Sequence, residues 1–170
     1  MQFVVFILTY FVLAFNVIGY GYFFAKNLTA YNKSPNIGYM GLYGITFLTL
    51  ISYLTNLILK HDYAHNFIIQ IIGIFFFFYY FSSIKNLKQN RDIKYLLFFL
   101  TLSTTSILYF KSHDDFLYYH LSFIDNLTIN KVEFGLGNFD LAFNHVSSLF
   151  FFHSLFKLPF TENYFYFIGP

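Results

Sequence analysis

The chain has 170 residues, of which 57% are hydrophobic, 26% aromatic and only 11% charged, with a mean hydropathy of +0.54 and a net charge of +2. Because soluble domains carry about 25% charged residues, this composition cannot cover a water-facing surface and indicates a membrane protein. The small net charge argues against a nucleic-acid partner, and the absence of cysteine excludes disulfides and thiolate metal sites.

Four charge-free apolar runs predict membrane-spanning helices, since about 20 apolar residues cross the hydrocarbon core. These runs cover residues 1–25, 34–59, 66–84 and 95–110. No basic segment precedes the first run and no small-residue cleavage site follows it, so it is expected to stay as a span. A fifth candidate, residues 141–156, contains His145 and His153 and is either a further span or a re-entrant or interfacial helix.

The basic residues of the connecting loops predict the orientation. The first and third loops carry six of them, and the second and fourth loops carry three. The six are Lys26, Lys33, Lys85, Lys88, Arg91 and Lys94, and the three are Lys60, Lys111 and Lys131. Because lysine and arginine favour cytoplasmic loops, the fourth connection, residues 111–148, is predicted to be extracytoplasmic.

These features predict the fold class. We expect an all-α integral membrane protein with about four to six transmembrane helices and one organised extracytoplasmic loop. Residues 1–170 form a single helical membrane domain in this interpretation, because no repeat or flexible linker divides them. The chain becomes apolar again from Tyr164 and then stops at Pro170, which is expected of the N-terminal fragment of a longer polytopic protein.

The polar segment 111–148 holds the first candidate site. The adjacent carboxylates of Asp114 and Asp115 could bind a divalent cation, or one could act as a base while the other positions it. A solvated turn that ends a span is the alternative. His120 is placed for substrate contact or proton transfer, or it is a structural histidine at the membrane interface.

Turns and polar residues follow in the same segment. Residues 125–128 (DNLT) predict one turn and residues 134–138 (FGLGN) a second, which its glycines permit. Polar groups that enter a membrane helix are costly unless they line a cavity. Asn138, Asn144 and His145 are therefore candidate substrate-binding residues, with hydrogen bonding between helices as the alternative.

A second polar motif, HDYAH, lies between the second and third apolar runs. His61 and His65 stand at i and i+4, as in the zinc-protease motif H-E-x-x-H, with Asp62 at the position of the glutamate. No third ligand follows nearby, and the motif lies in a tight loop. We therefore interpret it as a polar hairpin rather than as a zinc site.

Three strings, DDFLYYHL, KVEFGLGN and FNHVSSLFF, carry a family resemblance over residues 111–160. They resemble a group of uncharacterised polytopic bacterial membrane proteins that look like GT-C-type glycosyltransferases. The resemblance implies a polyprenyl-phosphate sugar donor, a membrane-lipid environment and an active site on the outer face of the bacterial inner membrane. It gives Asp114 and Asp115 the role of base or divalent-metal ligands, and His120, Asn138, Asn144 and His145 match polar positions.

Two functions of different classes follow. The first is transfer of a sugar from a lipid-linked donor, with Asp114, Asp115 and His120 as catalytic residues. The second is a non-catalytic multi-pass protein that binds a lipid or a partner subunit, in which case the loop charges are only interfacial polarity. A transporter is a weaker third choice, because no carboxylate lies in the middle of a predicted span.

Overall fold

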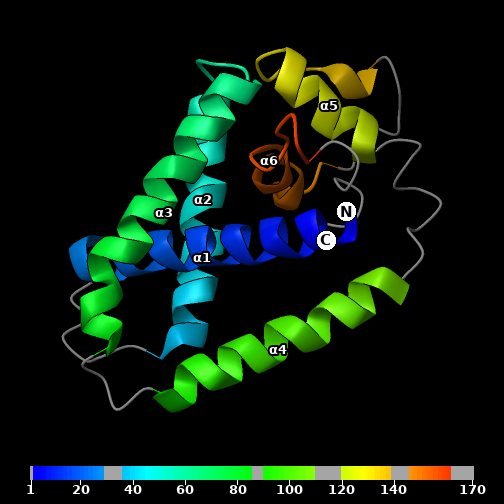
Figure 1. Cartoon of the computed structure of the whole chain (residues 1–170). Helices are drawn as coiled ribbons and strands as arrows, with labels where there is room; N and C mark the ends of the chain where they lie inside the picture. The colour runs from blue at the N-terminus through cyan, green and yellow to red at the C-terminus, as the bar shows by residue number, and fades with distance from the viewer. Residues whose placement is uncertain (1, 29–35, 86–89, 110–119, 139–145, 162–170) are drawn as a thin grey trace. The chain divides into compact units, whose positions relative to one another are not determined.

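The computed structural model describes residues 2–28, 36–85, 90–109, 120–138 and 146–161, and all regular structure in these ranges is helical (Figure 1). The two helices that begin the chain are α1 (Gln2–Leu28) and α2 (Ile37–Asn56). They are followed by α3 (Tyr63–Lys85), α4 (Asn90–Tyr109), α5 (Leu121–Ile129), the 3₁₀ turn η2 (Leu136–Asn138) and α6 (Ser148–Ser154).

Three of these helices are long and apolar enough to cross a membrane. The candidate spans are Val4–Asn27, Ile37–Asn56 and Tyr63–Tyr80, and the apolar part of α4, Ile93–Thr105, is shorter. The prediction of an all-α membrane protein is confirmed at this level. The fifth candidate contains α6, whose seven residues extend only about 10 Å at 1.5 Å per residue. A helix of that length cannot cross a hydrocarbon core of about 30 Å.

The chain divides into two compact units. Unit 1 comprises Met1–Leu48 and Gln70–Phe110, and unit 2 comprises Thr49–Ile69 and Lys111–Pro170. The boundaries between the units lie within α2, after Leu48, and within α3, before Gln70. The turn between these helices therefore belongs to unit 2.

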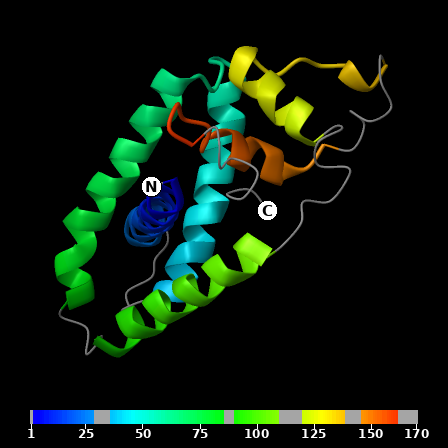
Figure 2. The same ribbon diagram turned by 45° about the vertical axis from the view of Figure 1, so that its right-hand side comes forward.

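In unit 1 the helices meet at glycines. A Cβ atom on Gly44 of α2 would lie 1.9 Å from the carbonyl oxygen of Val17 in α1, and one on Gly21 would lie 1.7 Å from that of Met40. Gly19 faces Gly73 of α3 in the same way. Helix α1 thus crosses between α2 and α3 (Figure 2) at points where only hydrogen fits, as small residues allow in membrane helices.

Aromatic and apolar side chains surround these crossings. The rings of Phe23 and Phe76 stack with centroids 4.4 Å apart, and those of Phe15 and Phe77 with centroids 4.9 Å apart. One polar side chain joins them: the Nδ2 of the fully buried Asn16 donates a hydrogen bond of 2.7 Å to the carbonyl oxygen of Gln70. Such an amide contributes directional contact between helices that are otherwise apolar.

In unit 2, helix α5 buries one continuous stripe formed by Phe123, Ile124, Leu127 and Thr128. The prediction of a turn at residues 125–128 was therefore wrong. Its turn-forming residues are tolerated because Leu127 and Thr128 complete the buried helical face, while the Asp125 carboxylate pairs with the Lys157 ammonium. Helix α6 packs on the last turn of α2, where the Tyr53 and Phe151 rings stack at 4.1 Å.

Candidate functional site

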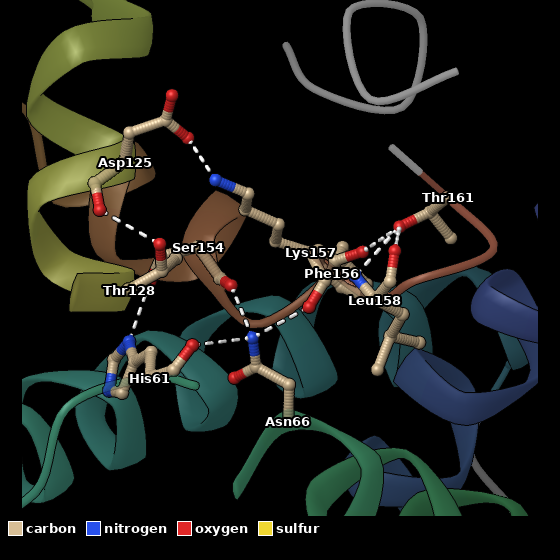
Figure 3. Close-up of polar contacts among 9 residues, drawn as sticks. All are labelled: His61, Asn66, Asp125, Thr128, Ser154, Phe156, Lys157, Leu158 and Thr161. Atoms are coloured by element: carbon tan, nitrogen blue, oxygen red, sulfur yellow. Dashed lines mark hydrogen bonds and ion pairs between the residues drawn. The ribbon is translucent and has the colours of Figure 1, made fainter. Parts of the chain in front are cut away.

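The amide of Asn66 in the first turns of α3 is the centre of a buried polar cluster (Figure 3). Its Nδ2 donates to three carbonyl oxygens: that of His61 at 2.9 Å, that of Ser154 at 2.8 Å and that of Lys157 at 2.9 Å. An amide carries two N–H donors, so the three acceptors share them. Asn66 is fully buried, and it fastens the end of α6 and the chain that follows to the α2–α3 turn.

The imidazole of His61 makes a second connection between the same segments. Its Nδ1 lies 2.6 Å from the Ser154 hydroxyl oxygen, and its Nε2 lies 3.0 Å from the Thr55 hydroxyl oxygen. Burial, and to a smaller extent the neighbouring His65, lower the pKa of His61 from 6.5 to about 3. The ring is therefore neutral at pH 7, with one nitrogen donating and the other accepting.

The hydroxyls on both sides of this ring are themselves bonded to backbone. The Ser154 Oγ donates to the carbonyl oxygen of Phe151 at 2.8 Å, and the Thr55 Oγ1 lies 2.9 Å from that of Ile51. Because each hydroxyl has one proton, Ser154 donates to Phe151 when it accepts from a protonated Nδ1 of His61, and Nε2 then accepts from the Thr55 hydroxyl. A serine beside a histidine also occurs in nucleophilic catalysis, but Ser154 and His61 are both fully buried here. The pair therefore acts as a structural connection.

The HDYAH motif has the geometry of a polar hairpin. The Asp62 Oδ1 accepts a hydrogen bond of 3.0 Å from the backbone N–H of His65, so Asp62 caps the start of α3. The rings of His61 and His65 are stacked, 4.8 Å apart and 8° from parallel. Nitrogen lone pairs lie in the ring planes, so parallel rings at this distance do not converge on one ion with bonds of about 2.0–2.1 Å.

A pocket of about 300 Å³ lies beside the glycine-containing turn of unit 2. Gly135 has a φ of 86°, and the N–H of Asn138 donates to the Gly135 carbonyl oxygen at 2.9 Å. The turn predicted at FGLGN is therefore confirmed. The lining combines phenylalanine rings and aliphatic side chains with two polar groups, and its residues are Phe123, Val132, Glu133, Phe134, Gly135, Leu136, Gly137, Asn138, Val146 and Phe151.

The structure describes two of the predicted site residues. Asn138 lines the pocket. His120 precedes α5, where its ring packs 4.7 Å from that of Phe150, and it is not one of the pocket residues. Among the described residues no three histidine, aspartate or glutamate side chains cluster as metal ligands. The other predicted site residues lie outside the described ranges, namely Asp114, Asp115, Asn144 and His145.

Sequence reasoning missed two groups of residues that the structure brings together. Glu133 was not singled out, although it directly precedes the FGLGN turn and lines the same pocket as Asn138. Asn66 and Ser154 were also missed. Asn66 directly follows HDYAH and could have been predicted to form hydrogen bonds, because an amide at the start of an apolar run needs polar partners. Ser154 gave no comparable signal, because its partner His61 is 93 residues away.

Comparison with known protein families places the chain in one of them. The model of a family described as "Domain of unknown function (DUF8201)" matches residues 1–169. The chain belongs to the DUF8201 family. No curated protein and no solved structure matches it. Because the DUF8201 match covers both structural units, the family includes the apolar helices as well as the segment 111–160.

Proposed function

We propose that this protein is a membrane-embedded, glycosyltransferase-like protein of the cell envelope. It takes a sugar from a polyprenyl-phosphate donor on the outer face of the bacterial inner membrane. The observation that carries the proposal is the pocket beside the 135–138 turn, in which the Glu133 carboxylate and the Asn138 amide stand among phenylalanine rings.

The chemistry of this pocket suits a sugar ring. Its volume of about 300 Å³ is at the lower end of the range of small-ligand sites, which are mostly apolar with a few polar groups that fix orientation. A carboxylate accepts hydrogen bonds from hydroxyls, and an amide both donates and accepts. The rings of Phe123, Phe134 and Phe151 offer apolar surface to the C–H face of a pyranose.

The resemblance to GT-C-type enzymes supplies the proposed reaction. Asp114 or Asp115 removes the proton of the acceptor hydroxyl as its oxygen bonds to the anomeric carbon, and the bond to the polyprenyl phosphate breaks, releasing that phosphate. His120 is the second proton-transfer group, and Asn138, Asn144 and His145 contact substrate. The adjacent carboxylates are also of the oxygen-ligand type that holds a divalent cation.

The test is transfer in vesicles that contain the protein and a radiolabelled polyprenyl-phosphate sugar. Asp114→Asn should keep expression and membrane insertion and lower turnover by about 10² or more, the scale for loss of a general base. Asn138→Ala should weaken donor binding. The matched control is Asn130→Ala, since Asn130 is exposed outside the pocket and its side-chain amide donates to the Asn126 Oδ1. Unchanged transfer in both Asp114→Asn and Asp115→Asn contradicts the enzyme proposal.

A second function, a non-catalytic membrane component that binds a lipid or a partner subunit, is favoured by one observation. The His61 imidazole and the Asn66 amide, the most conspicuous polar groups of unit 2, are used in internal hydrogen bonds. A protein of this kind binds the polyprenyl-phosphate sugar, or another lipid, and releases it unchanged. Saturable binding that Asn138→Ala weakens, without transfer to any acceptor, selects this second function.

A further inference from the structure

The turn between α2 and α3 exposes apolar side chains directly beyond the end of a span. The candidate span Ile37–Asn56 ends at Asn56, and the next three residues, Leu57, Ile58 and Leu59, are 53%, 67% and 54% exposed. A polar or glycine-rich turn would be expected if this region faced water. The turn therefore presents to its surroundings the same kind of surface as the span before it.

The exposed surface of α2 runs into this turn without interruption. Leu50 and Leu54 are exposed on α2, and Leu57 and Ile58 follow at the i+7 and i+8 positions from Leu50, on the same helical face. The backbone also continues the helical direction, because the N–H of Leu57 donates to the carbonyl oxygen of Tyr53. The surface that would face lipid along the span thus extends past Asn56.

A second segment of unit 2 lies against the turn. The N–H of His61 donates to the carbonyl oxygen of Leu127 at 3.0 Å, and that of Val132 donates to the carbonyl oxygen of Asn56 at 3.2 Å. These bonds hold residues 127–132 along the turn. This segment and the residues after it expose Ile129 and Phe134, the latter with 86% of its surface accessible. We call Leu57, Ile58, Leu59, Ile129 and Phe134 the apolar tip.

The charges around the apolar tip balance. Lys60 and Lys131 stand beside it, as do Asp62 and Glu133, and the Lys60 ammonium lies 3.8 Å from the Asp62 carboxylate. A surface without net charge does not attract an acidic or a basic partner electrostatically. Its contact is governed by apolar area, which favours the membrane interface that begins where the α2 span ends.

We infer that the apolar tip docks on the lipid bilayer. Its side chains enter the interfacial layer beside the ends of α2 and α3, while the long stems of Lys60 and Lys131 let their ammonium groups reach the headgroups. Phe134 belongs both to the tip and to the lining of the pocket, so the pocket opens at the level of the headgroups. The inference rests on the tip alone and does not require sugar transfer.

The chain contains no tryptophan, so a single introduced indole reports its own surroundings. Ile58→Trp and Phe134→Trp test the tip, and Leu50→Trp on the exposed face of α2 is the lipid-facing reference. Ser122→Trp, at an exposed position of the first turn of α5, two turns before Ile129, is the reference outside the tip. Each variant of the whole protein is placed in phosphatidylcholine vesicles with and without brominated acyl chains. Circular dichroism confirms that each variant is folded.

We expect bromine quenching of Ile58→Trp and Phe134→Trp to be at least half of that for Leu50→Trp, and quenching of Ser122→Trp to be small. Because the tip has no net charge, the quenching should change by less than about 1.5-fold between 0.05 and 0.5 M salt, or when phosphatidylglycerol is added. Quenching of either tip variant as weak as that of Ser122→Trp overturns the inference. Blue-shifted emission without quenching also overturns it, because the tip is then covered by protein.

Discussion

In unit 1 the helices meet at glycines, whereas in unit 2 the chain segments meet at a buried amide and an imidazole. The crossing of Gly44 and Val17 leaves no room for a Cβ atom, and the Asn66 amide of unit 2 reaches three carbonyl oxygens from two parts of the chain. Lipid tails do not drive apolar helices together, so helices within the bilayer associate through close packing. Unit 2 has irregular chain around short helices, and its backbone carbonyls need donors. Buried polar side chains are therefore needed in unit 2, where they donate hydrogen bonds to backbone carbonyls that no regular helix pairs.

The largest effect should come from the polar centre of unit 2. Asn66→Leu keeps the approximate size of the side chain but removes the amide donor of the His61 and Lys157 carbonyl oxygens and leaves the Ser154 carbonyl with only the Lys157 N–H. Each buried unsatisfied group costs about 1–3 kcal/mol. We expect a loss of about 3 kcal/mol or more in the free energy of unfolding, measured by titration of detergent micelles with dodecyl sulfate. Hydrogen exchange should increase in residues 146–161 and not in α1.

The exposed amide of Asn130 provides the control for this prediction. Its Nδ2 bonds to the Asn126 Oδ1, and surface substitutions of this kind change stability by about 0.5 kcal/mol or less. If Asn66→Leu were as mild as Asn130→Ala, the hydrogen bonds of Asn66 would not hold unit 2 together, and the contrast between the units would fail.

A smaller effect is expected at the glycine crossing of unit 1. Gly44→Ala puts a methyl group where a Cβ would lie 1.9 Å from the Val17 carbonyl oxygen, whereas Gly41→Ala, on the same helix, meets nothing within 4 Å. Overpacking costs about 1–3 kcal/mol, so Gly44→Ala should lower the free energy of unfolding by that amount. Gly41→Ala should be neutral or slightly stabilising, because alanine is the better helix former. Equal stability of the two variants would show that α1 and α2 are not in close contact.

The last effect is the smallest near neutral pH, because it appears only on acidification, and it should arise in unit 2. The pKa of His61 is lowered from 6.5 to about 3 in the folded protein, so between these values the unfolded chain binds a proton that the folded chain does not. Stability is then fully present above about pH 6.5 and falls as the pH drops towards 3, by up to about 1.4 kcal/mol per pH unit. His61→Gln should flatten this dependence in an unfolding series from pH 7 to 4. A slope that persists in His61→Gln would assign it to other groups.

The positions of the long helices could be predicted from the sequence because a helix that crosses the hydrocarbon layer needs an uninterrupted run of about 20 uncharged residues. The runs 34–59 and 66–84 correspond to α2 (Ile37–Asn56) and α3 (Tyr63–Lys85). Helix ends were less accurate where a local polar group decides them. Asp62 caps α3 through the N–H of His65, so this helix begins three residues before the predicted run.

The short helices and the polar centre were less predictable. The turn assigned to residues 125–128 lies within α5, because burial of Leu127 and Thr128 outweighs the turn preference of Asp125 and Asn126. The candidate span at 141–156 contains only the seven-residue α6 among its described residues. The pairing of His61 with Ser154 joins positions 93 residues apart, and a local pattern carries no information on such a contact. The FGLGN turn was predictable because Gly135 needs its positive φ.

The hydrogen bonds of Asn66 cannot all form until late in the synthesis of this protein. Two of its acceptors, the carbonyls of Ser154 and Lys157, come 88 and 91 residues later in the chain. A ribosome that adds about 5–20 residues per second needs on the order of 5–20 s to supply them. During that interval the α2–α3 hairpin has already emerged with an amide and an imidazole that lack their final partners. A nascent chain that stops before Ser154 therefore keeps these groups unmatched at the end of two apolar helices, a state that proteolytic quality control can distinguish from the finished protein.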